Sequence, residues 1–326
     1  MKAVVFEQSG GPEVLRLAEV PAPTPGEHEL LIDVHATALN RADLLQRRGL
    51  YPPPPGASAL LGLECSGVVV QVGPGVTRAA VGDRVMALLA GGGYAERVVV
   101  HEGIALPVPE RLSLEDAAAV PEAFLTASEA LLVEAELRAG QSVLVTAAGS
   151  GVGSAAIQIA KLRGAFVIGS ASAPKLSAVR ALGADLALDR EREDFVEALR
   201  AATSGRGVDA IVDFVGGSAL PRHQSCLAER GRLVAIGLLG GATGALDLGR
   251  LLMKRQQVRG LVMRTRSTLE KLELVERFRR ELLPAVADGR LAPRLDQIFP
   301  LSAVVAAHER MEQNQSLGKI VLRVKE

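Results

Sequence analysis

The spacing of hydrophobic residues changes once along the chain, near residue 121. Before that point, short apolar runs are separated by glycine- and proline-rich turns, as in Gly10-Gly11-Pro12. Short strands at this spacing are typical of a β-barrel or β-sandwich. The predicted strands are 2–6, 15–19, 29–38, 66–72, 84–87 and 95–100, with one helix at 41–48 capped by Asn40.

After residue 121, strand-like and helix-like segments alternate for more than a hundred residues. This alternation predicts parallel βαβ units and an α/β doubly wound sheet. The predicted strands are 143–147, 166–170, 186–188, 208–215, 231–237 and 258–263, and the helices are 152–163, 174–182, 192–203, 218–228 and 248–255. A helix at 113–137, kinked or broken at Pro121, precedes them.

The remaining segments are a long helix at 268–287, a strand at 295–299, a helix at 302–313 and a strand at 319–324. A single sheet would be overfilled by them, so we expect the C-terminus to return to the first domain. At 326 residues the chain fits two domains, 1–121 completed by 265–326, and 122–264.

The stretch 142–163 reads as a buried strand, a glycine turn and a helix. Such a turn aims the free N–H groups of the helix and its dipole at an anion, most often a pyrophosphate. Ala148 and Ser150 stand where the first two glycines of the dinucleotide fingerprint would be, so the downstream alternation carries much of the interpretation. The uncharged stretch 139–160 could also suggest a membrane span, but its glycines and serines indicate a turn.

Composition removes several classes of function. The net charge is zero and the longest basic block has two residues, which disfavours a nucleic-acid binder. The first residues turn acidic after three apolar positions and lack a signal-peptide core. Two cysteines far apart, Cys65 and Cys226, favour a reducing, cytoplasmic location over a disulfide framework.

The end of the second predicted strand bears on the choice of nucleotide. About twenty residues past the glycine turn, where NAD-binding folds usually place a carboxylate, the chain has Ser170, Ser172 and Lys175. Without a carboxylate to repel a 2′-phosphate, this segment favours NADPH over NADH. On these residues alone, a solvated surface role for Lys175 is equally acceptable.

Few side chains are suited to other chemistry. The five histidines show no metal-ligand spacing with one another or with the cysteines, and Ser150 does not lie in a nucleophile elbow. A hydride transfer needs mainly alignment and a hydrogen bond to the substrate oxygen. Tyr51 and Asn40 are the candidates for that bond. Asn40 could instead be only a helix cap, and Tyr51 only a ring packed on the prolines at 52–55.

Several motifs together resemble the zinc-independent quinone oxidoreductases of the medium-chain dehydrogenase/reductase superfamily, with the closest likeness to the tumour-suppressor-inducible subgroup. The resemblance spans essentially the whole chain. It is carried by Ala38-Leu-Asn40-Arg-Ala-Asp43, Tyr51 with its proline loop, Gly62-Leu-Glu64, Val81-Gly-Asp-Arg84, Gly92-Gly-Tyr-Ala95, Ala147-Ala-Gly-Ser-Gly-Val-Gly153 and Gly318-Lys-Ile320.

The resemblance implies a GroES-like β-barrel catalytic domain, a Rossmann domain that binds NADPH, an active-site cleft between them and a homodimer. It implies reduction of a small-molecule quinone, with Tyr51, Asn40 and Ser150 as catalytic residues. Zinc-bearing relatives have Cys at position 40 and His at position 63, so no metal is expected. The cofactor-binding residues expected are Thr126, Ser150, Gly151, Val152, Gly153, Ser170, Ser172, Lys175, Arg190, Phe214, Val215, Gly237, Leu238, Leu239 and Lys319.

Arg190 departs from the subgroup, which tends to have an aromatic residue near the adenosine. The arginine could stack on adenine or add a second cation for the phosphate. Two other functions stay open: an NADPH-dependent 2-alkenal or enone reductase on the same scaffold, and a low-activity NADPH-binding protein with a structural or RNA-contact role. No membrane or nucleic-acid partner is expected.

Overall fold

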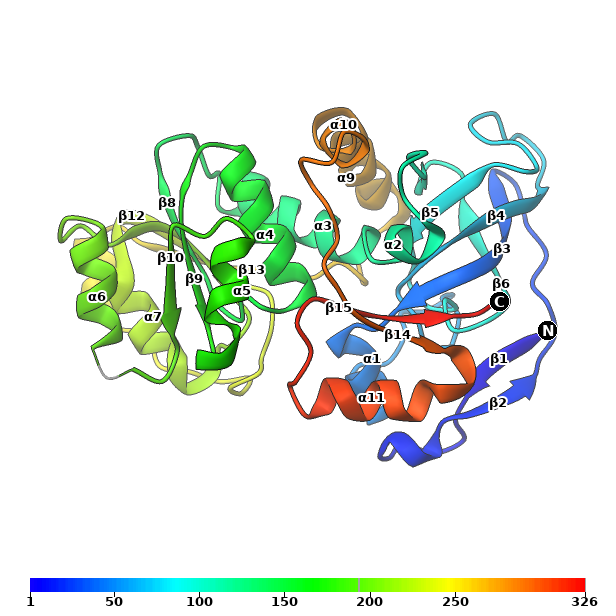
Figure 1. Cartoon of the computed structure of the whole chain (residues 1–326), viewed down its shortest axis with the longest axis horizontal. Helices are drawn as coiled ribbons and strands as arrows, with labels where there is room; N and C mark the ends of the chain where they lie inside the picture. The colour runs from blue at the N-terminus through cyan, green and yellow to red at the C-terminus, as the bar shows by residue number, and fades with distance from the viewer. Residues whose placement is uncertain (193, 326) are drawn as a thin grey trace. The chain divides into compact units, whose positions relative to one another are not determined.

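The computed structural model describes residues 1–192 and 194–325 and contains two compact units. The first unit joins Met1–Leu125 to the segment that begins at Met263, and the second is Thr126–Val262. In Figure 1 the first unit carries the blue, cyan and orange-to-red parts of the chain, and the second is mainly green and yellow.

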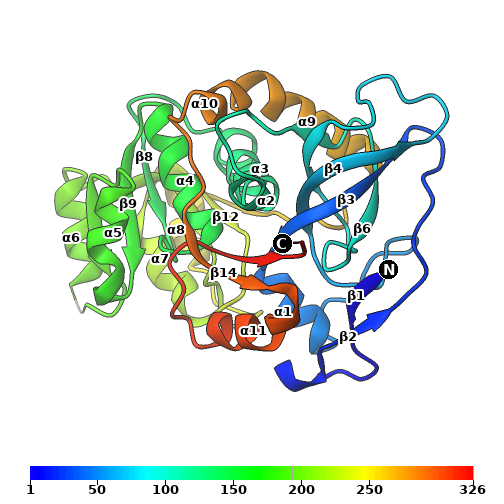
Figure 2. The ribbon, with the colours of Figure 1, turned by 45° about the vertical axis from the view of Figure 1, so that its right-hand side comes forward.

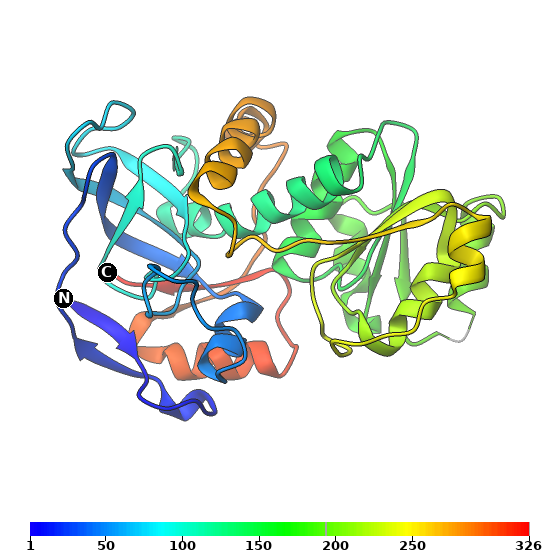
Figure 3. The same cartoon turned by 180° about the vertical axis from the view of Figure 1, so that it is seen from behind.

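The second unit is built on a six-stranded parallel sheet in the order β10-β9-β8-β11-β12-β13. Helices cover both of its faces (Figures 1 and 3). The chain order reverses between β8 and β11, which confirms the predicted doubly wound sheet. The strands are β8 (Ser142–Val145), β9 (Phe166–Ala171), β10 (Leu186–Asp189), β11 (Val208–Asp213), β12 (Leu227–Ala235) and β13 (Gln257–Gly260).

Helices α4 (Gly151–Leu162), α5 (Leu176–Ala181), α6 (Phe195–Ala202), α7 (Leu220–Cys226) and α8 (Leu248–Met253) connect these strands. Residue 193, in the helix expected at 192–203, lies outside the described residues. Strand residues such as Leu144, Ile168 and Ile211 are buried and pack in one cluster with Phe195 and Leu199 of α6. This packing explains why the strands read as continuous apolar runs.

The first unit contains a seven-stranded, mostly antiparallel sheet, seen from another side in Figure 2. Its central strand β3 pairs with β4 along one edge and with β6 and β15 along the other. The strands are β3 (Glu29–Ala38), β4 (Glu64–Val72), β5 (Arg84–Leu88), β6 (Arg97–His101), β7 (Ala105–Pro107), β14 (Leu295–Pro300) and β15 (Lys319–Arg323). A separate hairpin joins β1 (Lys2–Val5) to β2 (Arg16–Glu19).

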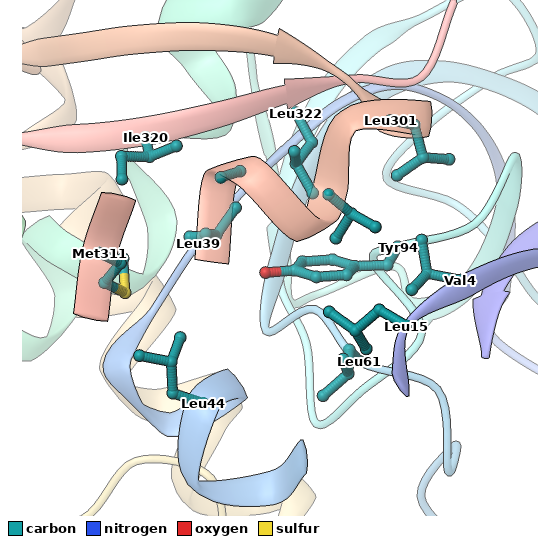
Figure 4. Packing of buried hydrophobic residues seen from close by; sticks show 12 residues of the cluster. Val4, Leu15, Leu39, Leu44, Leu61, Tyr94, Leu301, Met311, Ile320 and Leu322 are labelled. Atoms are coloured by element: carbon teal, nitrogen blue, oxygen red, sulfur yellow. The ribbon is translucent and has the colours of Figure 1, made fainter. Parts of the chain in front are cut away.

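The end of the chain is part of this first sheet. β15 runs antiparallel to β3, with Val321 opposite Ala38, and β14 lies parallel to β15. Helix α11 (Val304–Glu312) covers the strands and packs near α1 (Arg41–Arg47). Figure 4 shows the buried cluster beneath them, in which the ring of Tyr94 lies among aliphatic side chains from both ends of the chain.

Two predicted helices differ from the structure. The helix expected at 268–287 is divided into α9 (Thr268–Glu281) and α10 (Leu283–Ala287), because Leu282 has φ −127° and Pro284 supplies no backbone N–H. The helix expected at 113–137 is α2 (Leu114–Ala118), α3 (Pro121–Ser128) and a π-helical turn, Glu129–Glu134. Pro121 begins a new helix, a position where proline is well tolerated.

Two sequence interpretations gain structural detail. The uncharged stretch 139–160 is divided between β8 and α4, and no helix among the described residues is long and apolar enough to cross a bilayer. Cys65 and Cys226 are both buried as free thiols.

Candidate active-site residues

The predicted nucleotide-binding residues of the second unit gather where its parallel strands end. Ser150 follows β8 and caps α4, with its Oγ accepting a hydrogen bond from the Gly153 backbone N at 3.1 Å. Gly151, Val152 and Gly153 form the first turn of this twelve-residue helix. The N–H groups and dipole of such a turn favour an anionic group.

Gly153 is required by the packing of α4 on the preceding loop. A Cβ at this position would lie 2.5 Å from the Ala147 carbonyl oxygen and 2.9 Å from Ala148 Cα. Both neighbours are backbone atoms, so neither can turn aside. Gly153 therefore has the role of the third glycine in the dinucleotide fingerprint, close helix–strand packing, while Ala148 and Ser150 occupy the first two positions.

Thr126, in α3, has a buried hydroxyl without a partner. The side chain is 4% exposed, yet Oγ1 makes no hydrogen bond to any residue that the structure describes. A buried hydroxyl is normally satisfied. The unpartnered oxygen fits a bound cofactor that supplies the missing partner, and Thr126 as a nucleotide-binding residue stays a prediction.

The ends of β9 and β10 carry the residues predicted to select the nucleotide. Ser170 is buried in β9, and its carbonyl accepts from the Ala148 N at 2.9 Å. Ser172 and Lys175 bound the short 3-10 turn that follows, and both are half-buried. Arg190 follows β10 with an exposed side chain whose Nε donates to Glu191 at 2.8 Å. None of these positions carries an acidic side chain.

A buried carboxylate shapes the loop after β11. Asp213 accepts from the backbone N of Val215 at 2.9 Å, and Thr146 Oγ1 accepts from the Phe214 N at 2.9 Å. Nδ1 of the buried His223 lies 3.1 Å from Asp213 Oδ2, and this contact lowers the pKa of Asp213 against the effect of burial.

The loop after β12 packs on the same backbone. The Leu239 N donates to the Phe214 carbonyl at 3.2 Å, and a Cβ at Gly237 would lie 2.7 Å from that oxygen. Leu238 and Leu239 are more than half exposed.

In the first unit, Asn40, Glu64 and Lys319 form a buried cluster. Lys319 Nζ lies 2.5 Å from Glu64 Oε1, 2.7 Å from Asn40 Oδ1 and 2.8 Å from the Leu39 carbonyl. Asn40 Nδ2 donates to Glu64 at 2.9 Å and to the Ala38 carbonyl at 3.2 Å. Lys319, predicted to bind the cofactor, therefore already has three oxygen partners in its own unit. Asn40 is the N-cap of α1 by position, but its side chain belongs to this cluster.

Tyr51 lies on the proline loop that follows α1, and Arg264 holds it. Arg264 Nη1 donates to the Tyr51 carbonyl at 3.1 Å, and its Cζ lies 5.3 Å from the centre of the phenol ring. The Tyr51 hydroxyl makes no hydrogen bond to the described residues, whereas the other tyrosine, Tyr94, contacts Asp43 at 3.3 Å. Tyr51 is thus a fixed ring with an available donor.

Two carboxyl groups of this unit have strongly raised pKa values. Burial, assisted by the charge of Glu64, raises the pKa of Glu122 to about 8. Burial also raises the pKa of Asp43 to about 6, although the N–H groups of Asn40 and Gly62 oppose the shift. Burial and the charge of Glu122 raise the pKa of Tyr51, while Arg264 acts in the opposite direction. Raised carboxyl pKa values of this kind are common in active sites.

The residues do not fit the catalytic zinc of related dehydrogenases. Leu63 offers no ligand atom, and the ammonium of Lys319 takes the oxygens of Asn40 and Glu64. Among the residues that the structure describes, no three His, Cys, Asp or Glu side chains converge as a metal site.

Sequence reasoning missed Glu122, Arg264 and Lys271 as site residues. Glu122 is half-buried, and Arg264 and Lys271 are buried. Arg264 and Lys271 are separated from Tyr51 by more than two hundred residues in the sequence. The available signal was a charge in an apolar context, Arg264 after the run at 261–263 and Glu122 after the run at 117–120. Nothing local indicates which distant residue such a charge meets.

The chain matches two family models. Residues 26–110 match the alcohol dehydrogenase GroES-like domain, and residues 151–277 match the zinc-binding dehydrogenase domain. The matches fall in the barrel-like sheet of the first unit and mainly in the doubly wound sheet of the second.

Whole-length relatives agree with these models. The chain is 34% identical to quinone oxidoreductase 1 of Escherichia coli, over 98% of both chains. The crystal structure of the E. coli quinone oxidoreductase complexed with NADPH superimposes with a TM-score of 0.88 at 33% identity, over 99% of this chain and all of that one. The chain is also similar to the crystal structure of an NAD-dependent alcohol dehydrogenase, with a TM-score of 0.88 and 36% identity over all of both chains. It is similar to the CurK enoyl reductase with a TM-score of 0.88 and 29% identity, over 99% of this chain and 98% of that one.

The buried Glu64–Lys319 pair should be a major contributor to the stability of the first unit. Lys319→Met leaves the Glu64 carboxylate buried without its cation and is expected to lower the free energy of unfolding by about 3–5 kcal/mol. The matched control is Lys325→Met, which removes a half-exposed pair with Asp33 and should change it by less than about 1 kcal/mol. Urea unfolding followed by circular dichroism measures both, and equal losses would contradict this account.

Glu122 should make stability depend on pH. Its carboxyl pKa rises from 4.5 to about 8 on folding, so the folded protein binds more protons than the unfolded chain between these values. Stability should therefore fall as pH rises through that window. In Glu122→Gln this contribution is absent. The unfolding temperature of the variant, relative to that of the parent, should therefore rise as the pH increases from about 5 to about 8.5. A difference that does not change with pH would show that Glu122 ionises normally.

Proposed function

The chain belongs to the zinc-independent, quinone-oxidoreductase-like branch of the medium-chain dehydrogenase/reductase superfamily, and we propose that it reduces quinones with NADPH. Membership makes it an oxidoreductase that binds a nicotinamide cofactor. The observation that carries the proposal further is Tyr51, a fixed phenol whose hydroxyl has no hydrogen-bond partner among the described residues.

The cofactor would be held by the strand ends of the second unit. The first turn of α4, from Gly151 to Gly153, receives the pyrophosphate, and Ser150 and Thr126 offer hydroxyls. The segment from Ser170 to Lys175 receives the adenosine ribose, with Lys175 and Arg190 facing a 2′-phosphate. The loops that begin at Phe214 and Gly237, with Leu238 and Leu239, supply backbone and apolar contacts.

When bound, reduced nicotinamide supplies a hydride. As the hydride adds to one end of the quinone, negative charge develops on a quinone oxygen, and the Tyr51 O–H donates a hydrogen bond to that oxygen, directly or through water. The hydride supplies one hydrogen of the hydroquinone, and one proton from solvent, taken up by the charged oxygen, supplies the other. The chain contributes mainly alignment, because Tyr51 is already held in place.

Asn40 and Lys319 have supporting roles in this proposal. Both Nδ2 hydrogens of Asn40 are used by Glu64 and Ala38, and Lys319 is held by three oxygens, so neither offers a donor to the substrate without breaking the cluster. They position the start of α1, from which the Tyr51 loop continues.

A second candidate function is the reduction of an α,β-unsaturated aldehyde or ketone. It is favoured by the likeness to the CurK enoyl reductase and by the same geometry, since an enolate oxygen would also accept from Tyr51. Turnover of a quinone and of an enone at equal concentrations separates the two. NADPH binding without turnover of either would indicate a low-activity binding protein, and filter binding at low salt would test RNA contact.

We also propose a homodimer. β13 is an edge strand of the sheet in the second unit, and Val258 in it and Val262 just after it are more than a third exposed. The outer edge of β13 pairs with no other strand among the described residues, and an exposed edge of this kind favours pairing with a second chain. Sedimentation equilibrium measures the mass in solution, and a monomer at all concentrations would reject the dimer.

Removing the Tyr51 hydroxyl should slow the reaction without disturbing the cofactor. Tyr51→Phe is expected to lower quinone turnover by about 10–100-fold, because the hydrogen bond forms to charge that develops in the transition state. NADPH affinity should stay within a factor of about two. Tyr94→Phe, which alters the only other tyrosine, should keep quinone turnover. Unchanged turnover in Tyr51→Phe would remove the proposed role.

The nucleotide preference should depend on Lys175. In Lys175→Met the NADPH dissociation constant should rise about tenfold while that of NADH stays nearly constant, since only NADPH carries the 2′-phosphate. Arg180→Met, an exposed cation farther along α5, is the control and should change neither. An equal rise in the dissociation constants of NADPH and NADH would show that Lys175 does not bind the 2′-phosphate.

A further inference from the structure

Arg264 is a buried cation whose partners are all neutral. The side chain is 3% exposed, and its nitrogens donate to the Ala90 carbonyl at 2.8 Å, the Tyr51 carbonyl at 3.1 Å and Gln46 Oε1 at 2.8 Å. No carboxylate among the described residues forms an ion pair with it. A buried charge without a counter-ion is unfavourable, so its presence calls for a reason beyond packing.

The position of Arg264 supplies that reason. Its Cζ lies 5.3 Å from the centre of the Tyr51 ring, within the range of a cation–π contact. The planar guanidinium donates at the same time to the Tyr51 carbonyl, to Gln46 near the end of α1 and to Ala90 in the turn after β5. Three fixed acceptors around one planar group leave little freedom to the proline loop.

Lys271 contacts the backbone of Arg264. Its Nζ donates to the Arg264 carbonyl at 2.9 Å, and its side chain is 9% exposed. Lys271 thus adds a second positive charge and fixes the backbone from which Arg264 extends. Arg264 also lines a cavity of about 850 Å³ in the first unit, together with Ser58, Gly91 and Gly92.

We propose that Arg264 is the positioning residue for Tyr51, fixing the phenol and placing beside it a positive charge that has no ion-pair partner among the described residues. This inference rests on the proposed role of Tyr51 in reduction. The charge stabilises the phenol when its O–H polarises toward an acceptor, so it makes Tyr51 a stronger hydrogen-bond donor. The charged groups that act on the Tyr51 phenol are Glu122, which disfavours the phenolate, and Arg264, which favours it.

Tyrosine absorbance tests the charge effect without any substrate. The chain has two tyrosines and no tryptophan, and burial with the nearby Asp43 holds the pKa of Tyr94 well above the ordinary range. Phenolate absorbance after a rapid alkaline pH jump, read before unfolding, therefore reports Tyr51. Tyr51→Phe identifies the signal by removing it.

In Arg264→Gln the Tyr51 titration midpoint should rise by about one pH unit, because the positive charge is lost. Arg279→Gln is the matched control: Arg279 also donates to a main-chain carbonyl of this unit, that of Ala105, and should leave the midpoint unchanged. An unchanged midpoint in folded Arg264→Gln, with native circular dichroism and parental NADPH affinity, would overturn the proposal.

A second variant separates the effect of the charge at position 264 from that of the planar side chain. It also tests the proposal if Arg264→Gln fails to fold. Arg264→Lys keeps the charge but not the planar fork, so its midpoint should stay near that of the parent while quinone turnover falls about tenfold. Turnover equal to that of the parent would refute the positioning role. Adding Tyr51→Phe to either Arg264 variant should lower turnover no further than Tyr51→Phe alone, and fully additive losses would also refute it.

The two proposals fail in different ways. If the protein has no reductase activity, the proposed function falls, but the absorbance titration still decides whether Arg264 acts on the Tyr51 phenol.

Discussion

The buried ion pair between Glu64 and Lys319 is the constraint on which the first unit depends. Glu64 begins β4 and Lys319 begins β15, and the same carboxylate accepts from Asn40 at the start of α1 and from the Glu122 backbone N in α3 at 2.8 Å. One pair therefore fixes four segments that are up to 279 residues apart. Removing either partner would leave the other charge buried and unpaired. The stability of these four segments therefore depends on the same ion pair.

The same cluster bears on metal binding, because its residues leave no oxygen available for a zinc ion. The ammonium of Lys319 lies buried among the oxygens of Leu39, Asn40 and Glu64. It neutralises Glu64 and orders Asn40, but it has no open position for a substrate oxygen. In the proposed reaction, the developing charge would be stabilised by the Tyr51 hydroxyl, which has no hydrogen-bond partner among the described residues.

The sequence predicted the doubly wound sheet well because the central strands β8, β9 and β11 are buried on both faces and each crossover helix has its own periodicity. It also predicted the strand, glycine turn and helix at 142–163, since the three are adjacent in sequence. It did not predict the partners of Lys319 or Arg264, which depend on strand pairing between opposite ends of the chain. The break at Leu282 was missed because the apolar periodicity continues through it, although Pro284 was a visible signal. Polar contacts between distant residues produce no periodic pattern in the sequence.

The central claim is that the chain transfers a hydride from NADPH to a quinone through alignment rather than metal chemistry. The most direct measurement is the loss of nicotinamide absorbance with purified protein and a simple quinone, using NADPH and then NADH, before and after dialysis against EDTA. We expect quinone-dependent oxidation that prefers NADPH and is unaffected by EDTA. NADPH binding without quinone-dependent oxidation, or activity that EDTA abolishes, would contradict the account.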